Sequence, residues 1–138
     1  MNIHRVALIG SIAVVVGAVI AGLWLIGSPT EQRQQRLDAR RVSDLVQLSQ
    51  AVYRHRNERR ALPGSTSDLV DGRRLSRLPS DPSTEEPYEY RVTGERQFEL
   101  CAVFARPSRS EDAQDFWHHE AGRHCYEFDV PDPPAGVR

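Results

Sequence analysis

The sequence predicts an α+β protein in which a membrane-spanning helix leads into a long amphipathic helix packed on a small antiparallel sheet. Three patterns predict this architecture: an uncharged block of twenty-one residues near the N-terminus, a stretch with apolar residues at helical spacing, and runs of alternating apolar and polar residues. The formal net charge is −1 over 138 residues, so no general basic field indicates nucleic acid as a partner. We expect one small domain beside the membrane segment.

The uncharged block runs from Val6 to Ile26 and follows a short tail at residues 1–5. As a helix it would be roughly 30 Å long, which matches the hydrocarbon core of a bilayer. A secretory signal has a shorter apolar region, about 7–15 residues, and a small-residue cleavage site. We therefore expect an uncleaved, single-pass anchor in the inner (cytoplasmic) membrane, with the lipid bilayer as its partner.

Small residues lie on one stripe of this anchor: Gly10, Ala13, Gly17 and Ala21. This spacing lets two membrane helices approach closely, which predicts helix packing and self-association in the membrane. Gly and Ala are also common in membrane helices that do not associate. Both interpretations stay open.

The next segment predicts an amphipathic helix from about Glu31 to Arg60, which a Leu-Pro-Gly turn ends. Its apolar residues define a face that packs on other elements: Leu37, Val42, Leu45, Val46, Leu48, Val52 and Tyr53. Its polar residues define the opposite, solvent-facing side: Arg40, Asp44, Gln47, Gln50 and Arg54. The arginines of residues 33–41 and 54–60 either attract anionic lipid headgroups or form a solvated face that pairs with Asp38 and Glu58.

The rest of the chain predicts a small antiparallel sheet. Two alternating runs, Tyr88–Val92 and Gln97–Ala105, are joined by a loop that contains glycine, which predicts a β-hairpin, and a third strand is expected at Arg123–Val130.

The connecting segments are a capped helical turn at Ser65–Asp68, a proline-rich connector at Leu78–Pro87, a polar loop at Pro107–Gly122 and a disordered tail at residues 131–138. The domain itself is expected at residues 27–130. The aromatic residues expected in its core are Tyr88, Tyr90, Phe98, Phe104, Tyr126 and Phe128.

The alternation also predicts where the only two cysteines point. Cys101 and Cys125 both fall among the polar residues of their strands, opposite the aromatic side chains that would face the core. If the strands are neighbours, the two Cα atoms approach to roughly 4.5–5.5 Å, which suits a disulfide worth about 3.5 kcal/mol by the chain-entropy estimate. Because disulfides are rare in the cytosol, this pairing favours a periplasmic domain.

The polar loop and the third strand carry the candidate metal ligands His118, His119 and His124. No pair of them has the helical i, i+4 spacing of a zinc protease, and the sequence contains no Cys-x-x-Cys. Cys125 beside His124 is the only local pair of nucleophile and base, but adjacent strand residues point to opposite faces. We therefore expect no metal, no cofactor and no catalytic residue, and hence no enzyme.

The order of these parts resembles that of the type IV pilin-like proteins, most closely the major pseudopilin of type II secretion. The resemblance covers about residues 35 to 105. Its motifs are Asp-Leu…Ala…Tyr…Leu-Pro, a Leu-Pro-x-Asp-Pro loop and a Tyr-x-Tyr strand, which correspond to Asp44, Leu45, Ala51, Tyr53, Leu62, Pro63, Leu78, Pro79, Asp81, Pro82, Tyr88 and Tyr90. The resemblance implies an extracytoplasmic domain that takes part in secretion or pilus machinery.

Two features of that family are missing from this chain. Pilins have a peptidase site before an aromatic residue and a glutamate at the fifth mature position, whereas no acidic residue precedes Glu31 here. The calcium loop of the pseudopilins, rich in Asp and Gly, is replaced by the segment Glu111–Cys125. We therefore expect a pilin-like domain on a permanent anchor rather than a filament subunit.

The arginines near the anchor favour the opposite orientation. Only Arg5 precedes the anchor, whereas four arginines follow it within residues 33–41, and the positive-inside rule would keep the domain in the cytoplasm. We favour the periplasmic side because of the paired cysteines and the resemblance.

The first functional hypothesis is therefore a single-pass protein of the bacterial envelope with a non-catalytic structural or interaction role and envelope proteins as partners. One alternative is an extracytoplasmic sensor or ligand-binding domain that uses the loop Pro107–Gly122. The other is a metal-binding or redox protein that uses the two cysteines and the three histidines.

Overall fold

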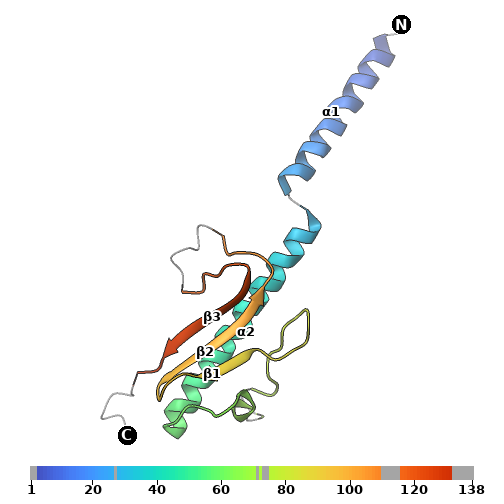
Figure 1. The fold of residues 1–138 in the computed structure, drawn as a ribbon. Helices are drawn as coiled ribbons and strands as arrows, with labels where there is room; N and C mark the ends of the chain where they lie inside the picture. Colours follow the sequence, from blue (N-terminus) through green and yellow to red (C-terminus); the bar gives the residue numbers. More distant parts are fainter. Residues whose placement is uncertain (1–2, 27, 71, 73–74, 110–115, 132–138) are drawn as a thin grey trace. The chain divides into compact units, whose positions relative to one another are not determined.

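The computed structural model of this chain describes residues 3–26, 28–70, 72, 75–109 and 116–131. Its elements are α1 (Ile3–Ile26), α2 (Pro29–Arg59), the 3-10 helix η1 (Thr66–Leu69), β1 (Glu89–Val92), β2 (Gln97–Phe104) and β3 (Gly122–Asp129). Two helices and a three-stranded antiparallel sheet confirm the α+β class (Figure 1). The chain forms two compact units, Met1–Gln34 and Gln35–Arg138.

The helix α1 is long and apolar enough to cross a membrane between His4 and Gly22, with a mean hydropathy of 2.2 and none of that window buried. Its large side chains stay exposed, such as Val14 at 72% and Ile9 at 65%. A helix that exposes apolar side chains in this way suits contact with lipid. The helix therefore has the length and composition that the prediction of a membrane-spanning segment requires.

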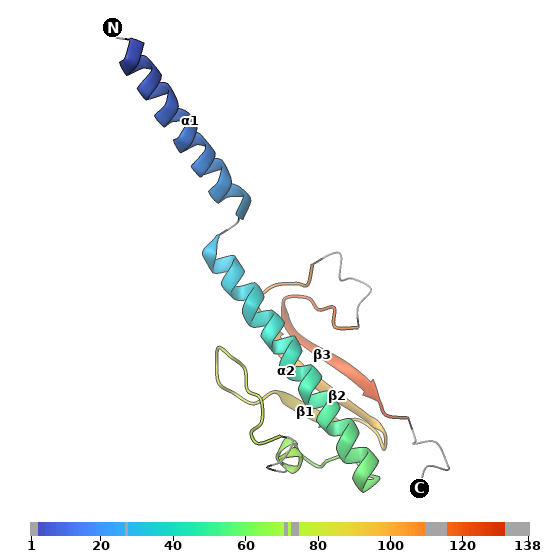
Figure 2. The same ribbon diagram turned by 180° about the vertical axis from the view of Figure 1, so that it is seen from behind.

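The helix α2 covers one face of the sheet, whose strand order is β1-β2-β3 (Figures 1 and 2). Both strand pairs are antiparallel, with Leu100 of β2 opposite Tyr90 on one side and Tyr126 on the other. The backbone N–H of Thr93 donates to the carbonyl of Gln97 at 2.9 Å and closes the turn between β1 and β2. The predicted hairpin and third strand are confirmed, and each begins or ends within one residue of its expected bounds.

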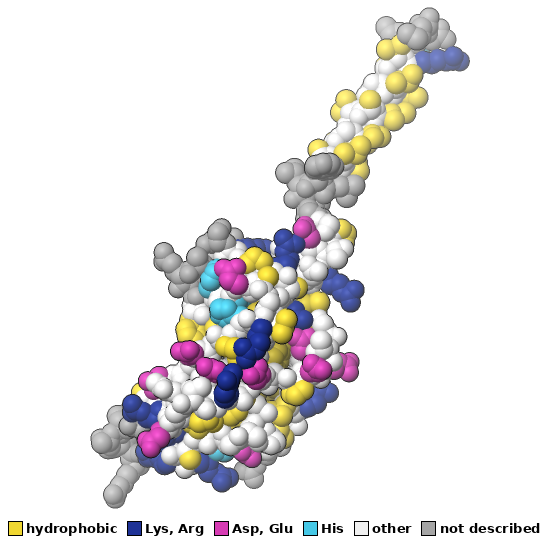
Figure 3. Space-filling model, viewed as in Figure 1, with side chains coloured by type: hydrophobic (Ala, Val, Ile, Leu, Met, Phe, Trp, Pro, Cys, Tyr) yellow, Lys and Arg dark blue, Asp and Glu magenta, His cyan; other side chains and the backbone are white. Residues whose placement is uncertain are grey.

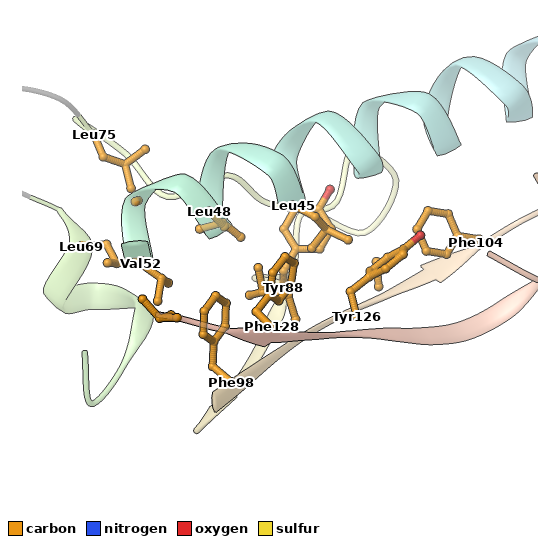
Figure 4. Packing of buried hydrophobic residues seen from close by; sticks show 14 residues of the cluster. Leu45, Leu48, Val52, Leu69, Leu75, Tyr88, Phe98, Phe104, Tyr126 and Phe128 are labelled. Atoms are coloured by element: carbon orange, nitrogen blue, oxygen red, sulfur yellow. The ribbon is translucent and has the colours of Figure 1, made fainter. Parts of the chain in front are cut away.

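The hydrophobic core lies between α2 and the inner face of the sheet (Figure 4). Leu45 and Val52 of α2 and Phe98 of β2 are fully buried, and each such side chain contributes about 1.5–3 kcal/mol. Phe98 stacks on Phe128 with ring centroids 4.7 Å apart. The six aromatic residues expected in the core are buried in it or packed against it: Tyr88, Tyr90, Phe98, Phe104, Tyr126 and Phe128.

One expectation about α2 is wrong. Asp44, assigned to the solvent side, is only 8% exposed, and Arg41, assigned to an exposed arginine cluster, is only 6% exposed. Both are buried because the connector after Leu78 brings its own polar groups against this side of α2. The hydroxyl of Tyr88 donates to Asp44 Oδ2 at 3.0 Å, so the polar side of α2 is partly an interior surface.

The predicted turn at Ser65 is confirmed, because the backbone N–H of Ser65 donates to Asp68 Oδ2 at 3.0 Å where η1 begins. The loop that was expected to be polar also contributes an aromatic side chain to the packing. Trp117 of this loop lies against Tyr126, with ring centroids 4.9 Å apart. Residues 110–115 of that loop and residues 132–138 of the predicted tail lie outside the described residues.

Candidate functional site

Cys101 of β2 and Cys125 of β3 form a disulfide, as the strand alternation predicts. The two residues are directly opposite in the antiparallel register, and their Cα atoms are 4.0 Å apart. The bond lies on the outer face of the sheet, which is the face away from α2, because the neighbouring residues of β2 fill the core. The disulfide joins residues 24 apart in sequence, and this closure contributes about 3.5 kcal/mol.

Charged side chains surround the disulfide on the outer face. Arg123 Nη2 donates to Glu89 Oε2 at 2.8 Å and to Cys101 Sγ at 3.4 Å. The Arg123 guanidinium holds the pKa of the Glu89 carboxyl below its ordinary value. Arg91 pairs with both Glu89 and Glu99 at 3.4 Å. Figure 3 views this side of the domain and shows basic and acidic side chains mixed across it, so the surface is polar and its exposed pairs add little stability.

The candidate metal ligands are distributed over separate environments. His119 is buried and stacks on Phe104 with ring centroids 3.6 Å apart. His118 Nε2 lies 3.9 Å from Glu120 Oε1, and His124 packs edge-on against Tyr126. Among the described residues, the three histidines do not form a group of ligand atoms close enough to share an ion.

A different set of potential metal ligands does come together, namely Glu99, Cys101 and Cys125, whose ligand atoms all lie within 4.8 Å of one another. A metal would need the thiolates of the cysteines. The two sulfur atoms are bonded to each other instead, so in this state the group is a disulfide beside a carboxylate.

The polar interior beside α2 contains an ionic cluster formed by Asp38, Arg41 and Asp81. Arg41 contacts Asp81 with two nitrogen atoms, Nε at 2.6 Å and Nη2 at 3.1 Å, and its Nη1 donates to Asp38 Oδ1 at 2.8 Å. The Asp38 carboxylate also accepts the backbone N–H groups of Ala105 and Arg106 at 3.0 Å. The ionic cluster therefore joins α2 to the connector and to the end of β2.

Both partners of the Arg41–Asp81 pair are charged at neutral pH. The hydrogen bond from Arg41 to Asp81 raises the pKa of the Arg41 guanidinium, although burial opposes this. Burial acts to raise the pKa of Asp81, but Arg41 and the backbone N–H groups of Ser83 and Thr84 outweigh it and lower that pKa. The sequence signal for this cluster was the Leu-Pro-x-Asp-Pro loop, which contains Asp81, but the pattern did not reveal the partner on α2.

A cavity of about 390 Å³ lies between α2 and the two ends of the polar loop. This loop cavity is lined by Asp38 and Val42 on α2 and by Arg106, Arg109, Trp117 and His119 on the loop. Burial lowers the pKa of His119, so its imidazole is neutral at pH 7. The ends of the loop at Pro107–Gly122, which its sequence makes a candidate binding segment, therefore line a cavity.

The four small residues of α1 lie on the surface of the single chain. Gly10 and Gly17 have nothing within 4 Å of the position that a Cβ atom would occupy, and Ala13 and Ala21 are exposed. Their packing against a second helix stays a prediction.

No family model, curated protein or solved structure matches this chain. The geometry itself defines the class: an α+β protein with an apolar N-terminal helix and a disulfide across the outer face of its sheet.

Proposed function

We propose that this chain is a single-pass protein of the bacterial inner membrane whose periplasmic, pilin-like domain has a structural or interaction role in the envelope and no catalytic activity. The observation that carries the proposal is the disulfide between Cys101 and Cys125 in a domain joined to an apolar helix. A disulfide persists in an oxidising compartment, and the apolar helix accounts for attachment to the membrane that borders it.

The contacts of the pattern residues support the pilin-like part of the proposal. Asp81 of the Leu-Pro-x-Asp-Pro loop pairs with Arg41, and Tyr88 donates to Asp44. Tyr90 donates from its hydroxyl to the carbonyl of Pro63 at 2.9 Å. Several residues that carry the resemblance therefore help to join the connector, the hairpin and α2 into one domain.

The orientation can be tested with single cysteines introduced outside the native disulfide. Gln50→Cys lies on the exposed side of α2, and Asn2→Cys precedes the apolar segment. In intact spheroplasts, a membrane-impermeant maleimide should label Gln50→Cys, whereas Asn2→Cys should react only after the membrane is permeabilised. The opposite pattern would place the domain in the cytoplasm, as the arginine distribution favours, and would contradict the proposal.

The interaction role can be tested by crosslinking in cells. A photo-reactive residue on the outer face, in place of Val103, which is 60% exposed, should form a specific adduct with an envelope protein. The same residue in place of Ser43, on the exposed side of α2, is the matched control for random proximity. Adducts at neither site, or identical adducts at both, would contradict an interaction through the outer face.

A ligand-binding role is the second candidate function, and the loop cavity is the observation that favours it. Its volume falls within the usual range for small-molecule sites, about 300–1,000 Å³. The metal-binding alternative has less support, because a metal would need Cys101 and Cys125 as thiolates and their sulfur atoms are bonded to each other.

A further inference from the structure

We propose that the loop cavity binds an amphipathic anion, in which a phosphate or carboxylate group is attached to a short apolar body. This inference names a ligand class for the ligand-binding candidate and does not depend on the proposed structural role. It rests on three properties of the loop cavity: its fixed walls, the excess of basic over acidic side chains among its described lining residues, and its mixed lining.

The walls of the loop cavity are held in place by hydrogen bonds on both sides of the loop. The backbone N–H of Ser108 donates to the carbonyl of His119 at 2.9 Å, and the backbone N–H of His119 donates to Ser108 Oγ at 3.0 Å. Asp38 of α2 holds the segment just before them through the N–H groups of Ala105 and Arg106. A preformed site of this kind loses little conformational entropy when a ligand binds.

Among the described lining residues of the loop cavity, basic side chains outnumber acidic ones. Asp38 is the only acidic residue among the described lining residues, and its carboxylate already accepts hydrogen bonds from Arg41 and two backbone N–H groups. Arg106 and Arg109 on the loop contribute two guanidinium groups to the lining. Guanidinium groups match phosphate and carboxylate oxygens in geometry as well as in charge, so the complementary ligand is an anion.

The rest of the lining requires an apolar part in the ligand. Val42 and Ala39 of α2, Pro107 and the half-buried indole of Trp117 contribute apolar surface. Inorganic phosphate would leave this surface in contact with water, whereas an attached alkyl or ring group would cover it at about 25 cal/mol per Å².

Two sources could supply such an anion. The apolar helix α1 makes the phosphate of an anionic membrane lipid one candidate, and a soluble amphipathic anion is the other. Both present the same chemistry to the arginines.

The test uses the full chain in nanodiscs of neutral phosphatidylcholine, with Trp24→Phe so that Trp117 is the only indole. Butyl phosphate should cause a saturable change in Trp117 fluorescence. Inorganic phosphate and butanol, which each carry half of the proposed chemistry, should bind at least about tenfold more weakly. Equal responses to all three probes, or no saturable response to butyl phosphate or to an anionic lipid, would overturn the proposal.

Variants assign any response to the loop cavity. Arg109→Gln removes one charge-assisted contact and should weaken binding about tenfold, and Arg106→Gln should act in the same direction. Arg60 comes directly after the end of α2 and is not among the described lining residues. Arg60→Gln therefore removes one positive charge away from the lining and should leave binding unchanged. Because Arg109 is exposed, its variant should unfold at the same temperature as the parent. Unchanged binding in Arg109→Gln would overturn the proposal.

The source is decided by the lipid composition of the nanodiscs. If phosphatidylglycerol alone shifts the Trp117 signal and competes with butyl phosphate, and both effects weaken in Arg109→Gln, a lipid phosphate is the ligand. If phosphatidylglycerol has no effect while butyl phosphate still binds, the ligand is a soluble anion. Either result supports the proposed class, and neither bears on the orientation or crosslinking tests of the proposed function.

Discussion

The domain joins distant segments in two contrasting places, the disulfide on the outer face of the sheet and the ionic cluster beside α2. The disulfide connects two adjacent strands by a covalent bond and is surrounded by exposed charges. The ionic cluster connects Arg41 of α2 to Asp81, forty residues further along the chain, and is almost excluded from water.

The difference lies in what each link requires. The disulfide acts mainly by limiting the freedom of the unfolded chain, so its effect depends on the redox state and little on its surroundings. The ionic cluster depends on mutual compensation, because a buried charge without its partner is strongly destabilising. The two links should therefore respond to different perturbations.

The largest effect is expected from Arg41→Met, which leaves Asp38 and Asp81 buried without their cation. The side chains of Arg41 and Asp38 are each only 7% exposed, so the free energy of unfolding should fall by about 3–5 kcal/mol. Thermal and urea unfolding followed by circular dichroism would measure it. Arg40→Met is the matched control, because Arg40 is 71% exposed in its side chain and its loss should change stability by less than about 0.5 kcal/mol. Similar losses in both variants would mean that the ionic cluster does not stabilise the domain.

Removal of the disulfide should have a slightly smaller effect. The double variant Cys101→Ala/Cys125→Ala should lose about 3.5 kcal/mol of unfolding free energy, because the unfolded chain gains freedom. Reduction of the wild-type protein with dithiothreitol should lower its stability by a similar amount and leave the double variant unchanged. If reductant has no effect on the wild-type protein, the disulfide does not contribute as proposed.

A third comparison separates a charged from a neutral hydrogen-bond acceptor. Tyr88→Phe removes the hydroxyl that donates to buried Asp44 and should cost about 1.5–3 kcal/mol, whereas Tyr90→Phe removes a hydrogen bond to the carbonyl of Pro63 and should cost about 1 kcal/mol. Urea midpoints of the two variants provide the measurement. A larger loss for Tyr90→Phe would show that the polar interior beside α2 contributes less than its geometry implies.

The smallest effect is a difference in pH dependence between the two links. The pKa of Asp81 is lowered in the folded protein, so its contribution is fully present above the ordinary pKa of about 4 and is lost as the pH falls below that value. The stability difference between wild type and Arg41→Met should therefore shrink from pH 6 to pH 3. The difference between wild type and the double cysteine variant should stay constant over the same range. A parallel loss in both comparisons would contradict the assignment of acid sensitivity to the ionic cluster.

Local periodicity was sufficient to predict the elements and the shared face of the two cysteines. The run from Val6 to Ile26 predicted α1 because the absence of charge over that length needs no knowledge of other segments. The period of two along β2 and β3 predicted that Cys101 and Cys125 share a face, since strand geometry alone determines the direction of successive side chains.

The same periodicity failed for the polar residues of α2. Asp44 and Arg41 lie on the side that a helical pattern assigns to solvent, but the connector that contains Asp81 and precedes Tyr88 covers them. The helical pattern could not predict the loop cavity either, because its lining comes from α2 and from both ends of a loop about seventy residues away.

The sequence by itself therefore determined the apolar helix, the secondary structure and the sheet face on which each cysteine lies, because each depends on the spacing of residues along one backbone segment. Only the tertiary structure decided which charges are buried and where a cavity forms. Those properties depend on which distant segment covers a given face, and local spacing carries no information about that contact.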